Sequence, residues 1–164
     1  MGDFTELNIR LKLKVDTPEN IVEILKYMAS LRSQEPTVLP EHSLFKALQW
    51  DTMLSSYNDP SGAPVKVSIF EKDKSDESLF MFVRSVYKDR GEAELFFDWI
   101  YPYIDALWIE FLGYIKYDSN DHPQLIYYTD EGIRFMAINR EEVENIGRRE
   151  ITFSWGIADV SQKL

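Results

Sequence analysis

Cysteine is absent from the chain, and its 164 residues include only two histidines. The absence of cysteine excludes disulfides, Cys-ligated zinc, iron–sulfur clusters and a cysteine nucleophile. It also suits a reducing compartment, so we expect a cytoplasmic protein. The first residues show no basic stretch followed by an apolar run, and no signal peptide is predicted. The most apolar window, residues 95–115, contains three acidic residues and a proline, so we expect no membrane span.

Sequence motifs for catalysis, cofactors and metals are also missing. The chain has no G-x-S-x-G, no G-x-G-x-x-G and no P-loop. Residues 118–129 begin with Asp118-Ser119-Asn120-Asp121, as a cation-binding loop could, but the sixth position is not glycine and the twelfth is Thr129, so the segment is not an EF-hand. We therefore predict no metal site and no cofactor. Whether the protein is an enzyme stays open, with the balance towards a non-enzymatic protein.

Alternating apolar and polar residues predict the strands of a sheet. Residues 5–15 alternate strictly, with Leu7, Ile9 and Leu11 on the apolar side, as in a half-buried strand. The remaining predicted strands cover residues 65–70, 79–88, 107–117, 124–129, 133–138 and 149–155. The predicted helices cover residues 17–33, 41–55, 92–101 and a short stretch at 139–147.

This order of elements predicts a single α+β domain over residues 1–164. We expect a ferredoxin-like (split βαβ) sandwich with its core at about residues 5–130. In that arrangement the helix at residues 41–55 is an insertion. Residues 131–164 then form a C-terminal extension that adds strands and a helix to the sheet.

The formal net charge of −10 is concentrated in one part of the chain. Residues 91–131 contain nine acidic residues and one basic residue. A strongly acidic protein is a poor ligand for nucleic acids and anionic membranes, so we expect neither as a partner. One interpretation is a solvated surface that keeps the protein soluble. The other is a docking surface for a basic protein, with four candidate residues: Glu92, Glu94, Asp98 and Asp105.

One face of the expected sheet is basic and aromatic. In the ferredoxin-like order the first strand lies between the third and the fourth, which places eight candidate ligand-binding residues on that face: Arg10, Lys12, Lys14, Phe80, Phe82, Arg84, Trp108 and Glu110. Such a face suits an anion, a nucleotide or an acidic peptide. The alternative is that the C-terminal segment, the helix at residues 41–55 or a second subunit covers it, with Glu110 paired to Arg10 or Lys12.

These features predict a small acidic cytosolic protein that acts by non-enzymatic binding to another protein or to a second copy of itself. The alternative is a protein, enzymatic or not, that binds a small molecule or anion on the basic and aromatic face. A cavity among Arg10, Arg84 and Trp108 would favour the alternative.

Overall fold

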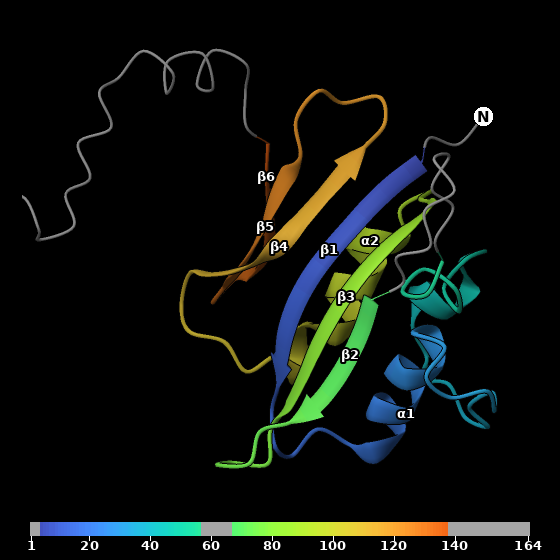
Figure 1. Ribbon diagram of the computed structural model, residues 1–164, viewed down its shortest axis with the longest axis vertical. Coiled ribbons are helices and arrows are strands. Elements are labelled where there is room, and N and C mark those ends of the chain that lie inside the picture. The colour runs from blue at the N-terminus through green and yellow to red at the C-terminus, as the bar shows by residue number, and fades with distance from the viewer. Residues whose placement is uncertain (1–3, 57–66, 138–164) are drawn as a thin grey trace, which may run out of the picture.

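A computed structural model describes residues 4–56 and 67–137 of the chain (Figure 1). It is an α+β structure with two helices and a six-stranded antiparallel sheet, whose strand order is β2-β3-β1-β4-β5-β6. In chain order the elements are β1 (Phe4–Leu13), α1 (Glu19–Met28), β2 (Val67–Lys72), β3 (Leu79–Lys88), α2 (Glu92–Ile100), β4 (Glu110–Tyr117), β5 (Gln124–Thr129) and β6 (Gly132–Ala137). Two short 3-10 helices, η1 (Ser43–Lys46) and η2 (Tyr101–Tyr103), precede β2 and follow α2.

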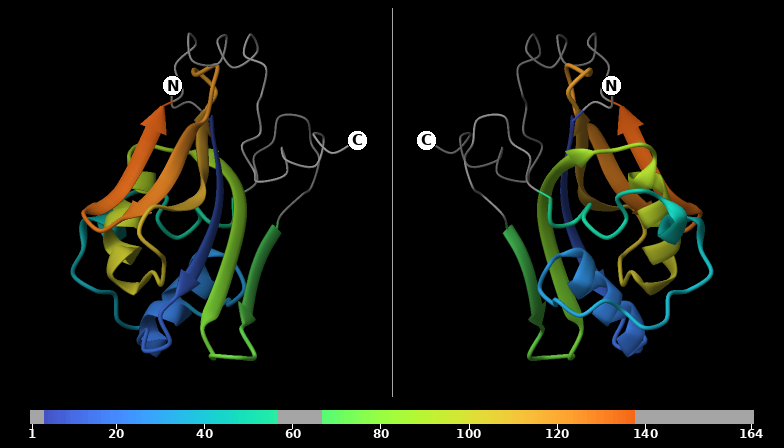
Figure 2. Two further views of the ribbon diagram at one scale, coloured as in Figure 1. Left: turned by 90° about the vertical axis from the view of Figure 1, so that its left-hand side faces the viewer. Right: turned by 90° about the vertical axis from the view of Figure 1, so that its right-hand side faces the viewer.

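The central strand is β1, which pairs with β3 on one side and β4 on the other. Leu7, Ile9, Leu11 and Leu13 are fully buried, which confirms the predicted alternation of this strand. Both helices lie against the face that these residues form (Figures 1 and 2). The core therefore lies between that face and the helices, which bury one side of each amphipathic element.

The segment predicted as a helix at residues 41–55 does not form an α-helix. It contains the four-residue helix η1, which ends because Ala47 has an extended backbone, followed by hydrogen-bonded turns. Leu44, Met53 and Leu54 still enter the core, whereas Leu48 is 70% exposed. The apolar spacing thus marked residues that reach the core from separate turns instead of from one helix face.

The remaining elements match their predicted positions closely, with two exceptions. Helix α1 is shorter than predicted, and the chain leaves it with Ser30 at a positive φ of 52°. Strand β4 begins at Glu110, three residues later than predicted. The strand predicted at residues 149–155 and the helix at 139–147 lie outside the described residues.

Candidate functional site

The sheet face opposite the helices is here called the open sheet face, because no helix of the described residues lies over it (Figure 2). Its side chains alternate with the buried residues of β1 and β3. The register pairs Arg10 with Phe82 and Lys12 with Phe80, and Arg84 lies opposite Asn8. The register therefore brings together five of the eight predicted ligand-binding residues, and a sixth, Glu110, lines a hollow with Arg10, Lys12 and Phe80.

Arg10 and Phe80 form the centre of this face. The guanidinium carbon of Arg10 lies 5.5 Å from the centroid of the Phe80 ring, which is within the range of a cation–π contact. Both residues line two shallow hollows of about 420 and 390 Å³, one on the side of β2 and one towards residues 105–111. Arg10 makes no ion pair with any described residue. A cation that is free to meet a ligand thus stands between two hollows.

Lys12 differs from Arg10 because two carboxylates neutralise it. Its Nζ lies 2.8 Å from Asp76 Oδ2 and 3.1 Å from Asp105 Oδ2. The hydrogen bonds to Asp76 and Asp105 raise the pKa of Lys12. The same bond from Lys12, together with donors from Ser78, holds the pKa of Asp76 well below its usual range. Asp105, predicted as part of an acidic docking surface, is therefore an ion-pair partner of the basic face.

Arg84 is neutralised as well, by a residue that the sequence analysis did not single out. Its Nε donates to Glu6 Oε1 at 3.1 Å, and the hydroxyl of Tyr114 donates to the same oxygen at 2.9 Å. Burial, followed by the bond to Glu6, raises the pKa of Tyr114. Glu6 thus joins Asp76 and Asp105 as an acid that balances this face.

A β-bulge near the start of β4 changes which of its side chains face the core. The register of β4 against β5 shifts between Phe111 and Gly113, which turns Leu112 into the core and Phe111 outwards. The Phe111 ring lies 5.5 Å from that of Tyr127. Glu110 makes no ion pair with Arg10 or Lys12, since its Oε2 accepts a hydrogen bond from the backbone N–H of Leu107 at 2.9 Å.

Residues 107–109 and Phe111 form an exposed group that we call the apolar loop. Trp108 is 71% exposed, and Leu107, Ile109 and Phe111 are also more than half exposed. Ile109 has a φ of 58°, a conformation that a β-branched residue rarely adopts. Leu107 and Phe111 line the same hollow as Arg10, so the loop is continuous with the open sheet face. Neither hollow beside Arg10 is lined by Arg84 or Trp108.

The predicted acidic docking surface is reduced to two residues of α2. Glu92 is only 2% exposed, and its carboxylate accepts a hydrogen bond from the backbone N–H of Arg90, so it does not reach the surface. Glu94 and Asp98 are exposed, with Asp98 Oδ2 3.2 Å from His42 Nε2. Lys14, predicted on the basic face, instead donates from Nζ to the carbonyl of Pro102 at 2.7 Å.

Several surface residues of the site were missed for identifiable reasons. Ile69 lies opposite Phe82 on the open face, and Phe70, which the alternation of this strand was expected to place there, lies opposite the buried Met81. Alternation separates the two sides of β2, but only its pairing with β3 shows which side faces the core. Tyr127 follows directly from the alternation of β5 around the buried Ile126. Phe111 could not be found in this way, because only the bulge directs it outwards.

Among residues 4–56 and 67–137, no group of three or more metal-ligating side chains comes together. Within the same part of the chain, every helix is too short or too polar to cross a membrane.

Comparison with known proteins yields no relative: no family, no curated protein and no solved structure matches the chain.

Proposed function

We propose that this protein acts without catalysis by binding another protein through the open sheet face and the apolar loop. The observation that carries the proposal is the exposure of the loop beside a free cation. Trp108 and Phe111 present large apolar side chains, and Phe111 lines the same hollow as Arg10. Contiguous exposed apolar surface of this kind is characteristic of interaction sites, and Trp and Arg are the residues that most often dominate binding energy.

The expected partner is a protein segment with apolar side chains and a carboxylate. The apolar side chains would cover Trp108 and Phe111, and the carboxylate would meet the guanidinium of Arg10. Lys12 and Arg84 already have acidic neighbours, so only one of these three cations needs a charge from the partner. The affinity of this interface is therefore expected to come more from apolar contacts than from ion pairs.

Affinity capture from the native lysate tests this proposal with four variants of the full chain. Trp108→Ser and Arg10→Glu alter the proposed surface. Leu48→Ser and Lys46→Glu make the same chemical changes at exposed positions on the helix side of the molecule. A captured protein should lose affinity by about tenfold or more with the first pair, the size of a typical hot-spot effect, and should be retained with the second.

Equal capture by all four variants would refute the assignment of this surface. If the purified protein self-associates and the first pair abolishes that association, the partner is a second copy of the chain. Binding to liposomes through Trp108, with no protein captured, would likewise exclude a protein partner.

We also propose that β1, α1, β2, β3, α2 and β4 form a ferredoxin-like unit, extended by β5 and β6 within a single domain that resides in the cytoplasm. The order β2-β3-β1-β4, with the helices on one face, supports the first part. The lack of cysteine supports the location in the cytoplasm.

A second candidate function is the binding of a small anion at Arg10. It is favoured by the two hollows that flank this free guanidinium. A titration with inorganic phosphate, followed by NMR, would show saturable shifts at Arg10 and Phe80 that Arg10→Gln abolishes. Without such shifts this candidate is excluded.

A further inference from the structure

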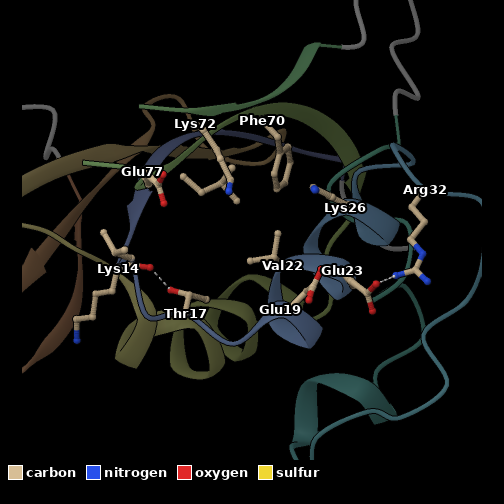
Figure 3. Close-up of a pocket in the computed structure, with 12 residues that line it drawn as sticks. Lys14, Thr17, Glu19, Val22, Glu23, Lys26, Arg32, Phe70, Lys72 and Glu77 are labelled. Carbon is tan, nitrogen blue, oxygen red and sulfur yellow. Dashed lines mark hydrogen bonds and ion pairs between the residues drawn. The ribbon is translucent and has the colours of Figure 1, made fainter. Parts of the chain in front are cut away.

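A separate cleft of about 720 Å³ lies on the helix side of the sheet, between α1 and the strands β2 and β3 (Figure 3). Val22, Phe70 and Leu79 form its apolar lining and are only half-buried. Phe70 belongs to the core face because it lies opposite the buried Met81 in the β2–β3 register. Leu79, two residues before Met81 in β3, lies on the same face and also packs against the core. The cleft is thus a part of the core face that α1 leaves accessible, and its size is within the range of small-molecule sites.

Two lysines provide the free positive charge of this cleft. Arg32 is held by an ion pair with Glu23, and Lys14 donates to a backbone carbonyl outside the cleft. Lys26 and Lys72 have no side-chain partner among the described residues. Figure 3 shows their ammonium groups directed into the cleft from either side of Phe70. An anionic group placed near the edge of that ring would therefore meet two donors.

Two carboxylates at the rim limit the charge of the ligand. Glu19 and Glu77 are exposed, line the cleft and have no side-chain partner in the described part of the chain. They offset the two lysines and would repel a dianion such as a phosphate monoester. A ligand with a single negative charge and an apolar body fits the balance of charges best.

We propose that this cleft binds a small organic monocarboxylate with an aromatic or aliphatic body. The carboxylate accepts charge-assisted hydrogen bonds from Lys26 and Lys72. The apolar body covers Phe70, Val22 and Leu79, which removes half-exposed core residues from water. The cleft lies on the opposite side of the sheet from Arg10, although Lys72 also lines the hollow of about 420 Å³ beside Arg10.

The test is a titration of the full chain with 4-phenylbutyrate, followed by NMR chemical shifts and calorimetry. Saturable shifts are expected at the residues that line the cleft. Lys26→Gln and Lys72→Gln should each weaken binding by about tenfold, as loss of a hydrogen bond to a charged group typically does. Glu19→Gln should strengthen it by removing a repelling charge. Arg10→Gln, the matched control on the open sheet face, should leave the affinity unchanged.

Four results would overturn the proposal. The first is the absence of saturable shifts at the cleft in the natural chain, with circular dichroism showing an intact fold. The second is equal affinity for the uncharged 4-phenylbutanol, which would show that the lysines recognise nothing. The third is weaker binding by Glu19→Gln, because removal of a repelling carboxylate cannot weaken an anion that is held by the two lysines. Loss of binding in Arg10→Gln would instead place the anion on the open sheet face and would refute the cleft.

Discussion

Replacement of Gly113 by alanine tests the bulge that directs Phe111 to the surface. Gly113 has a φ of 146°, and a Cβ at this position would lie 2.0 Å from the carbonyl oxygen of Asn8 and 2.9 Å from the Cα of Ile9. Both atoms belong to the backbone of the central strand, so they cannot move without separating β1 from β4. We expect Gly113→Ala to lower the free energy of unfolding by at least about 3 kcal/mol, in the upper range of single substitutions.

The structure supplies two matched controls for this prediction. Gly91 and Gly132 also have positive φ values, of 101° and 129°, but a Cβ at either position would meet nothing within 4 Å. Alanine at these positions should cost only the backbone term of about 1–2 kcal/mol. Urea unfolding of the three variants measures the difference. If Gly113→Ala costs no more than its two controls, β4 does not approach β1 as described and the position of Phe111 must be revised.

Three further predictions concern the core and its charged surroundings. Ile9→Ala or Leu11→Ala should each cost about 2–5 kcal/mol by urea unfolding, since both side chains are fully buried; a loss below about 1 kcal/mol at both positions would contradict the assigned alternation. Asp76 has a lowered pKa in the folded state, so its stabilising effect is complete above its unfolded pKa of about 3.9 and is lost as the pH falls through the folded pKa. The difference in urea midpoint between the natural protein and Asp76→Asn should therefore be largest near neutral pH and should shrink below about pH 4. Tyr87→Phe should be neutral or stabilising, by up to about 1 kcal/mol, because the buried hydroxyl has no hydrogen-bond partner among the described residues; a loss above about 1 kcal/mol would indicate that the hydroxyl is bonded.

The strands of this protein could be predicted because their alternation is a local property. Leu7, Ile9 and Leu11 face the core wherever β1 is placed in the sheet, since successive side chains of a strand point to opposite faces. The antiparallel neighbours of β1 then determine which residues of β3 share the open face. Arg10 and Phe80 could therefore be found together from the sequence.

The segment at residues 41–55 could not be predicted in the same way, because its apolar spacing has two structural solutions. Leu44, Met53 and Leu54 can reach the core from one helix or from separate turns. The tertiary context selects the turns. At the start of η1, the side chain of His42 accepts a hydrogen bond from the backbone N–H of Leu44. Periodicity alone does not contain this choice.

In the fourth strand, one extra residue at the bulge moves Leu112 and Phe111 to the sides opposite to those that simple alternation predicts. Alternation counted back from Ile115 places Leu112 on the open face, but the bulge gives Leu112 to the core and Phe111 to the surface. A bulge depends on Gly113, whose backbone the β1 strand approaches too closely for any side chain. The signal was therefore one glycine in a strand, which is compatible with a bulge but does not specify its direction.

The ion-pair partners of the charged residues change the kind of ligand that the open sheet face is expected to bind. Four cations were predicted there, which would have made it a general anion-binding surface. Lys12 is paired with Asp76 and Asp105, Arg84 with Glu6, and Lys14 is bonded to a backbone carbonyl. Arg10 alone among the four has no polar partner within the described residues. One free guanidinium beside exposed aromatic and aliphatic side chains selects for a single carboxylate within an apolar segment, because any further negative charge would face Asp76, Asp105 and Glu6 and be repelled.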